Sequence, residues 1–489
     1  MIREGSFEKN GMVFDRRIEP SDWRFSAAMV GLVRYFENQH LPYVTEGRYL
    51  FYNFNDVDLS QAETERGYLK FVETRFIKLM HHVKVRQLLS ENSGENIDIK
   101  EVKDRLNGNV VMKKFFKDFK EPLEEKETIL ALIEENSSEI IRETFINDKS
   151  LKNDIYGYGK FANMALYGKE SQQRCRLWGF YVDKERKTKS LGFNFDKNAA
   201  TVTDYMEFDY IPFAFSQGRE SIFVNNNVSV SCLMKSNNDV DNYLQNIEDT
   251  DKRVWNNIFY QMGQGSAFVS QDVEIILKRT KEESYHTILL RQTAIKIFKK
   301  LRANNKQGIN DTPLDKLLRV VVKVADDYYI NYSQEITNAI LNEVFLDDMI
   351  EQLFKLDNVR DNVNITGFRQ EQLIRINVEM YRYLKNMEGI METNKYLFGA
   401  YVAAQEVKNY FLGNKLENKM CGYRQKLTSS IVAKDYDRFI EIMLQLSSYT
   451  EIAFPFLHEL IKDFEGNKNL AYEFINNLNN VEKATKEDK

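Results

Sequence analysis

The sequence predicts an α+β protein in which a mixed N-terminal domain with antiparallel strands precedes an all-α helical bundle. The segments in which we find strand-like alternation of apolar and polar residues all precede residue 281. After residue 313, short polar breaks separate one amphipathic stretch from the next, as in a bundle of helices. Gly308 and Pro313 punctuate the chain between these parts. We therefore expect one domain at residues 1–308 and a second at 309–489.

The first expected elements are a buried helix and a hairpin. Ser21 and Asp22 are N-cap residues in front of 23–37, where apolar side chains cover nearly the whole circumference of a helix. A hairpin is expected at 43–54, with its turn at Glu46 and Gly47. Apolar residues at helical spacing then predict helices at 60–92, 110–119, 122–135 and 138–147.

A second strand-rich region carries a cluster of positive charge. Residues 174–195 are typical of two strands joined by an exposed turn, and further strands are expected at 201–215 and 272–280. Six Lys or Arg and two acids lie between residues 174 and 189. These basic residues could form a finger for a phosphate backbone, or they could simply keep a hairpin tip soluble. They are Arg174, Arg176, Lys184, Arg186, Lys187 and Lys189.

Residues 213–238 combine apolar runs with many uncharged hydrogen-bonding side chains. Strand-like runs at 211–215 and 221–224 flank a turn that begins at Ser216. Amides can pair with a base edge in a bidentate way, and an arginine can contact phosphate or guanine. This chemistry suits the reading of a nucleic acid by Gln217, Arg219, Asn225, Asn226 and Asn227. Alternatively, the three asparagines cap the helix that follows.

A third basic feature lies at the end of a helix expected over 284–302. No acidic residue occurs between Arg291 and Lys306. This helix end can contact phosphate, although positive charge at a helix C-terminus is also favoured by the helix dipole. Its basic residues are Lys296, Lys299, Lys300 and Arg302. Helices of the bundle are expected at 313–330, 333–356, 369–387, 395–412, 416–434, 436–446, 451–464 and 470–478.

Charge and cysteine content limit the class of protein. A net charge of -5 argues against a chain coated with positive charge, while 68 Lys and Arg leave room for local basic faces. Three distant cysteines and five histidines support neither a disulfide framework nor a structural zinc site. No run approaches the roughly 18 apolar residues that span a bilayer, and the start lacks an apolar signal core. We expect a cytoplasmic protein without a membrane contact.

Motifs for familiar catalytic chemistry are absent from the sequence. It has no GxxxxGK[ST] phosphate loop, no HExxH and no GxSxG, and no GxGxxG follows a strand. The paired acids at 326–327 and 347–348 lack histidine or further carboxylates at metal-binding spacing. We therefore expect neither an enzyme nor a bound cofactor or metal.

Three stretches resemble the large-subunit family of type I CRISPR Cascade effector complexes, the Cas-eight proteins of subtype A and B systems. They are DWRFSAAMVGLVRYFE at 22–37, ESIFVNNNVSVSCLMKSNN at 220–238, and the segment 418–461. The first is similar to the family's opening Asp-Trp, its small-residue helix and the aromatic residue that closes it. The last is similar to the family's paired helices with an acidic turn between them.

The resemblance implies a non-catalytic subunit at the foot of a guide-RNA complex. Such a subunit holds the 5′ handle of the guide RNA, inspects the protospacer-adjacent motif of target double-stranded DNA, contacts the other Cascade subunits and helps to recruit a helicase-nuclease. The chain departs from the family where Cys421, Tyr423, Arg424 and Lys426 stand, because the family often has a more arginine-rich helix there. Arg424 and Lys426 are the basic residues of this helix that we expect to contact nucleic acid. Its C-terminal bundle resembles the small subunits that line the displaced strand. Net acidity is compatible with this role, because guide pairing reads most of the target.

Two other functions are also compatible with the sequence. A helical protein-interaction scaffold without nucleic acid fits the negative net charge and the expected bundle. A nuclease with an unrecognised metal site would instead cleave nucleic acid as an isolated chain when magnesium or manganese is added.

Overall fold

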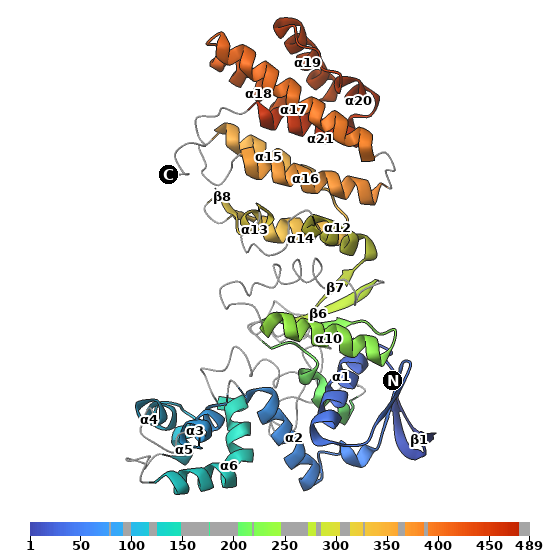
Figure 1. Cartoon of the computed structure of the whole chain (residues 1–489), viewed down its shortest axis with the longest axis vertical. Helices are drawn as coiled ribbons and strands as arrows, with labels where there is room; N and C mark the ends of the chain where they lie inside the picture. Colours follow the sequence, from blue (N-terminus) through green and yellow to red (C-terminus); the bar gives the residue numbers. More distant parts are fainter. Residues whose placement is uncertain are drawn as a thin grey trace, which may run out of the picture. The chain divides into compact units, whose positions relative to one another are not determined.

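The computed structural model describes residues 1–77, 80–90, 99–116, 125–147, 176, 204–217, 220–245, 272–279, 285–303, 313–325, 328–359, 367–385 and 390–478. These residues form two compact units (Figure 1), of which the first contains the described residues up to 290 and the second contains the described residues from 291 onward. Strands are concentrated in the first unit and helices dominate the second, which confirms the predicted α+β class. Helix α12 (Gln292–Ala303), which precedes the division expected at residue 308, packs on later helices and belongs to the second unit.

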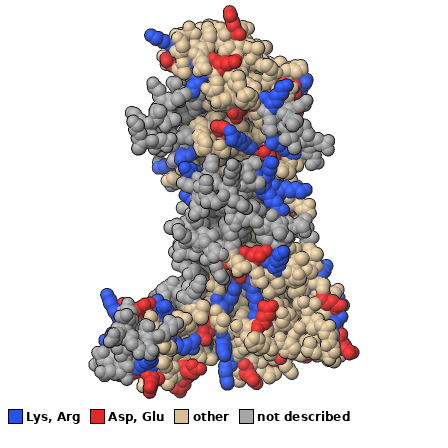
Figure 2. All heavy atoms as spheres, in the orientation of Figure 1, with Lys and Arg blue, Asp and Glu red and all other residues tan. Residues whose placement is uncertain are grey.

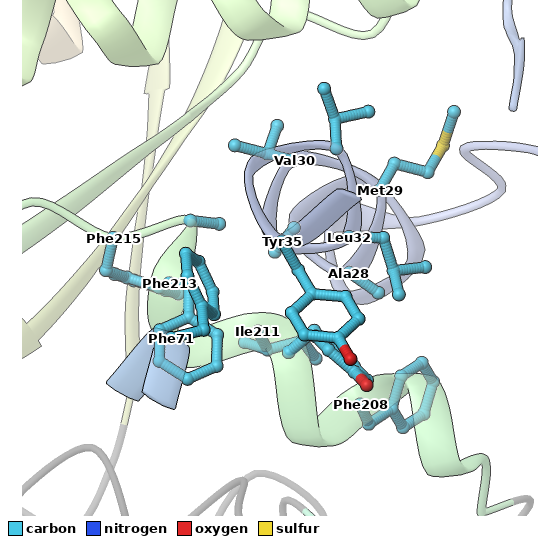
Figure 3. Packing of buried hydrophobic residues seen from close by; sticks show 14 of the residues in the cluster. Ala28, Met29, Val30, Leu32, Tyr35, Phe71, Phe208, Ile211, Phe213 and Phe215 are labelled. Atoms are coloured by element: carbon cyan, nitrogen blue, oxygen red, sulfur yellow. The ribbon is translucent and has the colours of Figure 1, made fainter. Parts of the chain in front are cut away.

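Helix α1 (Trp23–Gln39) lies at the centre of the first unit. The Asp22 side chain accepts a hydrogen bond from the Arg24 backbone N–H and caps the helix, as predicted. Twelve of its residues are buried, so the helix has no continuous polar side. Figure 3 shows rings from other elements packed around it, among them Phe71, Phe208 and Phe213. The ring of Tyr35, a residue of this helix, has centroid distances of 5.6 Å to the Phe71 ring and 5.0 Å to the Tyr210 ring.

An antiparallel sheet in the order β1-β2-β4-β3 covers part of this core. Its strands are β1 (Ile2–Lys9), β2 (Met12–Ile18), β3 (Val44–Glu46) and β4 (Tyr49–Tyr52). The hairpin predicted at 43–54 is confirmed as β3 and β4, with Gly47 in the turn at φ +58°. Leu50 and Tyr52 point into the core, because alternate residues of a strand face opposite sides of a sheet.

The segment η4 (Met206–Phe213) is a 3₁₀-helix, so the strands expected over 201–215 are wrong for this part. All seven residues from Glu207 to Phe213 are buried, and Pro212 lacks the N–H that a strand would donate to a neighbour. The segment packs along α1 instead of joining a sheet. A Cβ atom at Gly31 would lie 2.0 Å from the Tyr210 carbonyl oxygen, so glycine permits this close approach.

Helices between residues 81 and 147 form a second cluster of buried side chains in the first unit. The single helix expected over 60–92 is wrong, because the chain forms two helices there, α2 (Ala62–Arg75) and α3 (His81–Ser90). Conversely, the two helices expected over 122–147 are one helix, α6 (Lys126–Asn147). Two shorter helices complete this cluster, α4 (Ile99–Asn107) and α5 (Met112–Phe115).

A second antiparallel sheet, β5-β6-β7, lies beside α10 (Val230–Gln245) in the same unit. The strands expected at 221–224 and 272–280 are confirmed as β5 (Glu220–Asn225) and β6 (Val273–Arg279). The helix expected from residue 284 is wrong in its first part. Residues Tyr285–Leu290 form β7, which pairs with β6, and α12 begins only at Gln292.

The second unit consists mainly of helices packed around α21 (Phe464–Asn477). The helix expected over 313–330 is wrong, because α13 (Pro313–Leu318) is followed by a hairpin of β8 (Val321–Ala325) and β9 (Tyr328–Asn331). The remaining helices are α14 (Tyr332–Asn342), α15 (Asp347–Val359), α16 (Gly367–Leu384), α17 (Ile390–Gly413), α18 (Glu417–Val432), α19 (Tyr436–Thr450) and α20 (Leu457–Lys462).

Buried polar side chains fix α21 against its neighbours. The Asn377 amide of α16 donates to Asn469 of α21 at 3.0 Å and to Asp347 of α15 at 2.8 Å. The Tyr472 hydroxyl donates to Glu351 at 2.7 Å. Each bond satisfies a group that would be costly to bury alone. The three helices therefore have a defined relative position as well as an apolar contact.

Substitution of Gly31 by alanine should destabilise the protein. The added methyl group has to displace the Tyr210 backbone, and overpacking of this kind costs about 1–3 kcal/mol or more. Urea unfolding followed by circular dichroism measures the effect. Gly399→Ala on α17 is the control, since nothing lies within 4 Å of its Cβ position and alanine favours a helix by up to about 1 kcal/mol. A Gly31→Ala protein as stable as the parent would contradict the close approach.

The buried carboxyl group of Glu473 should make stability depend on pH. Burial, and then the charge of Glu371, raises the pKa of Glu473 to about 7. The folded state therefore holds a proton that the unfolded state releases above the ordinary value of 4.5. Stability is expected to fall as pH rises from about 4.5 to about 7, by roughly 2–3 kcal/mol. In Glu473→Gln the contribution of this group to the decline should disappear, whereas Glu441→Gln on the exposed face of α19 should keep it. Parallel profiles for the parent and Glu473→Gln would exclude this assignment.

Candidate nucleic-acid interface

Strand β5, in the stretch predicted to read nucleic acid, has its outer edge closed by side chains. The Asn237 amide of α10 accepts from the Val224 N–H and donates to the Val224 carbonyl, both at 2.9 Å. Nearer the start of the strand, the Ser216 hydroxyl accepts from the Ile222 N–H at 3.0 Å. The Ser216 N–H donates to the Ile222 carbonyl at the same distance. These bonds fix the backbone at Ser216, Ile222 and Val224.

Two of the predicted reading residues have their amides engaged inside the protein. Asn225 is 7% exposed, and its side-chain N–H donates to Glu274 of β6 at 2.9 Å. Asn226 is 4% exposed and donates to the Ser236 hydroxyl at 3.0 Å. Asn227 is half-buried, and the helix cap expected from the asparagines comes instead from Ser229, whose hydroxyl accepts from the Cys232 N–H. The asparagine run is thus structural in part, and its contact with nucleic acid stays a prediction.

A buried ion cluster holds the segment that leads into β5. Arg34 of α1 and Arg75 of α2 both contact the Asp241 carboxylate of α10, at 2.9 and 2.8 Å. Both guanidinium groups also donate to backbone carbonyls of this segment, Arg34 to Phe213 and Arg75 to Phe215. Burial lowers the pKa of Arg34 to about 10, which still leaves it charged near neutral pH. Two positive charges share one carboxylate, so the cluster carries a net positive charge.

The predicted residues at the turn lie beside this ion cluster. The Gln217 side chain is half-buried and donates to the Arg75 backbone carbonyl. Arg219 lies outside the described residues. The predicted reading segment is therefore anchored immediately before Arg219 by contacts that the sequence pattern did not indicate.

Of the predicted basic finger, only Arg176 belongs to the described part of the chain. Its guanidinium contacts Asp204 at 3.1 Å and Asp209 at 2.9 Å, and its side chain is 15% exposed. Burial by itself would lower the pKa of Arg176, but the two carboxylates raise it. Arg176 is thus held by acids of its own unit. The other five, Arg174, Lys184, Arg186, Lys187 and Lys189, lie outside the described residues.

Helix α12 presents predicted basic residues on its outer side. Lys296 and Lys300, one helical turn apart, are exposed, whereas Ile297 and Phe298 are buried. Within the described part of the chain, neither of these two lysines has an ion-pair partner. Lys299 is half-buried and has a partner, and the side chain of Arg302 lies outside the description. The two exposed lysines are therefore open to an anionic ligand.

The two basic residues predicted on α18 occupy different environments. Arg424 is 7% exposed, and its Nε–H donates to the Ile475 carbonyl of α21 at 3.3 Å. Lys426 is exposed, and its amine lies 5.8 Å from the centroid of the Tyr423 ring. Arg424 thus joins two helices, and Lys426 faces outward. A nucleic-acid contact at either residue stays a prediction.

Further residues beside Lys426 extend this surface. The Lys419 amine lies 3.5 Å from the centroid of Tyr449, a residue of α19 that is 37% exposed. The ring of Tyr423 lies 6.5 Å from that of Tyr449. We call Lys419, Tyr423, Lys426 and Tyr449 the α18 patch. Amines beside exposed rings suit unpaired nucleotides, because bases stack on rings and phosphates attract amines. The helical spacing of 419, 423 and 426 was the available signal, whereas the contribution from α19 requires the fold.

On the faces that Figure 2 shows, Lys and Arg lie among Asp and Glu without forming an unbroken basic surface over the described residues. Nowhere in the described ranges do three or more His, Cys, Asp or Glu side chains come together as a group able to hold a metal ion. Among the described helices, none combines the length and apolar character required to cross a membrane.

Comparison with known proteins gives one match. The sequence matches the family described as CRISPR-associated protein Csx8 (Cas_Csx8) over residues 14–262 and 246–478. These two overlapping stretches together cover nearly the whole chain. No curated protein and no solved structure matches the sequence.

Proposed function

The chain belongs to the family of CRISPR-associated protein Csx8, and from this premise we propose that it is a non-catalytic large subunit of a type I RNA-guided complex. The family match over both units is the observation that carries the proposal. In this role the chain holds the 5′ handle of the guide RNA, recognises the protospacer-adjacent motif and helps to recruit a helicase-nuclease. Its partners are the guide RNA, target double-stranded DNA and the other subunits of a Cascade complex.

The anchored segment before β5 supports the assignment of motif reading to the first unit. A protein in an RNA-guided complex needs to read only a short duplex element, because base pairing with the guide reads the remainder. Such reading requires a few polar side chains on a rigid backbone. We assign contacts with the motif to Gln217, Arg219 and Asn227, and a supporting role to the buried Asn225 and Asn226. The ion cluster around Asp241 and the closed edge of β5 supply the rigidity.

The second unit is assigned the contacts that do not depend on sequence. Lys296 and Lys300 of α12 can pair with phosphates, and the α18 patch can hold unpaired nucleotides. A net charge of -5 is compatible with this role, because other subunits share the contacts with the backbone of the nucleic acid.

The experiment that tests the proposal is purification of the tagged chain from its native organism. We expect short RNAs that share one repeat-derived 5′ end, together with other CRISPR-associated proteins, identified by RNA sequencing and mass spectrometry. An RNA-free preparation with only unrelated proteins would overturn the proposal and favour the helical interaction scaffold. Magnesium-dependent cleavage by the isolated chain would overturn the non-catalytic assignment.

Replacement of Lys296 and Lys300 by glutamine should weaken binding to all nucleic-acid sequences alike. Each phosphate contact that is lost lowers the slope of log K against log salt by about 0.9 for duplex DNA and about 0.7 for single strands. The measurement is affinity at several salt concentrations for the assembled complex. Lys355→Gln with Lys462→Gln, which removes two exposed lysines from α15 and α20, is the charge-matched control. An unchanged slope in the α12 variant would show that these amines only face solvent.

A further inference from the structure

The outer side of the N-terminal sheet carries aromatic and basic residues that the proposed function does not use. Leu50 and Tyr52 of β4 point into the core around α1, so Tyr49 and Phe51 point to the opposite side. Arg17 of β2 is directly opposite Phe51 in the sheet register and therefore shares this side. The sheet can be located by strand β1 in Figure 1.

The side chains on this side form a compact cluster of alternating rings and cations. The guanidinium carbon of Arg17 lies 4.6 Å from the centroid of Tyr49 and 5.5 Å from that of Phe7. Phe7 follows an irregularity in the pairing of β1 with β2, and its ring centroid lies 5.6 Å from that of Phe51. The Lys9 amine lies 5.0 Å from the Phe51 ring. We call Phe7, Lys9, Arg17, Tyr49 and Phe51 the outer cluster.

Among the described residues, no carboxylate pairs with Arg17, in contrast to the other basic residues of the sheet. Arg3 pairs with Glu19, Lys9 with Glu46 and Arg16 with Glu4. Within the described residues, Arg17 takes part in no ion pair, and its Nε atom is buried without a hydrogen-bond partner. Asp15, two residues before it, accepts from the Phe54 N–H at 2.7 Å. A guanidinium that lies close to two rings and has no ion-pair partner among the described residues is available to an anion.

We propose that the outer cluster binds unpaired nucleotides of a single-stranded nucleic acid, with Arg17 contacting a phosphate and the half-buried rings of Phe7 and Tyr49 stacking on bases. Both a ring and a guanidinium plane offer a flat face to a base, and guanidinium N–H groups match phosphate oxygens. The unpaired positive charge selects an anionic ligand, and the rings select one that carries aromatic groups. An unpaired nucleotide supplies both. This site rests on the proposed function in an RNA-guided complex, and it adds a ligand contact on a part of the first unit distant in sequence from residues 213–238.

The site is tested with the purified full chain and fluorescent oligouridylate and oligothymidylate as probes. Arg17→Gln and Tyr49→Leu should each weaken binding about tenfold, the effect of losing one stacked base or one charged contact. Tyr49→Phe should retain binding, because the ring remains. Arg16→Gln is the matched control: it removes the neighbouring arginine, which also lies over a ring but is paired with Glu4, and we expect less than about a twofold change.

Three results would overturn the site. The first is unchanged affinity in both Arg17→Gln and Tyr49→Leu when thermal unfolding shows that the variants are folded. The second is failure of the parent chain to bind either probe. The third is loss of co-purifying subunits from Arg17→Gln with probe affinity intact, which would identify a protein-docking surface instead. The proposed function fails separately, if guide RNAs are absent from the parent complex, so the two failures are distinguishable.

Discussion

The close approach of α1 to the 3₁₀ segment at Gly31 is the constraint on which the first unit depends. A helix with twelve buried residues needs partners on every side. The segment 206–213 packs against a side of the helix that no sheet covers. Hydrogen bonds from Tyr52 to Glu207 and from Tyr68 to the Asp209 carbonyl then tie that segment to β4 and α2. The position of the segment determines where residues 214–217 leave the core, and hence where β5 and its polar residues lie. In the second unit, α21 has the corresponding central place.

The basic residues of this protein fall into two groups: those held by a partner within the fold, and those that are open to a ligand. Arg34, Arg75 and Arg176 are all held by carboxylates of the first unit, and Arg424 is held by a carbonyl of α21. In the described ranges, by contrast, Lys296, Lys300 and Arg17 have no such partner. A charge that is removed from water costs desolvation free energy, and a fixed partner in the fold offsets that cost. A cation that binds a ligand stays unpaired until the ligand arrives. Local pairing therefore says more about function here than net charge does.

The sequence predicted elements well where one strong pattern fixed them. Capping by Asp22 and the apolar circumference of 23–37 identified α1, and polar breaks located most helices of the second unit. Strands β1 and β2 gave no comparable signal, because β1 is exposed along most of its length and lacks apolar alternation. The run 211–215 was expected as a strand since it is apolar throughout, which a buried 3₁₀-helix also allows. At the candidate site, the amide chemistry was visible in sequence, but burial of Asn225 and Asn226 depends on Glu274 and Ser236, which distant or later elements bring to them.

The Asn237 side chain that pairs with Val224 protects the protein from self-association through β5. A primary amide carries the same donor and acceptor as a peptide group, so on the outer edge of β5 it takes the place of one residue of a neighbouring strand. Ser216 does the same at Ile222. An open edge strand with the apolar sequence of β5 would be a template for intermolecular pairing and aggregation. The Asn237 side chain, together with the hydroxyl and backbone N–H of Ser216, closes that edge without adding a strand, so this part of the chain is protected from self-association.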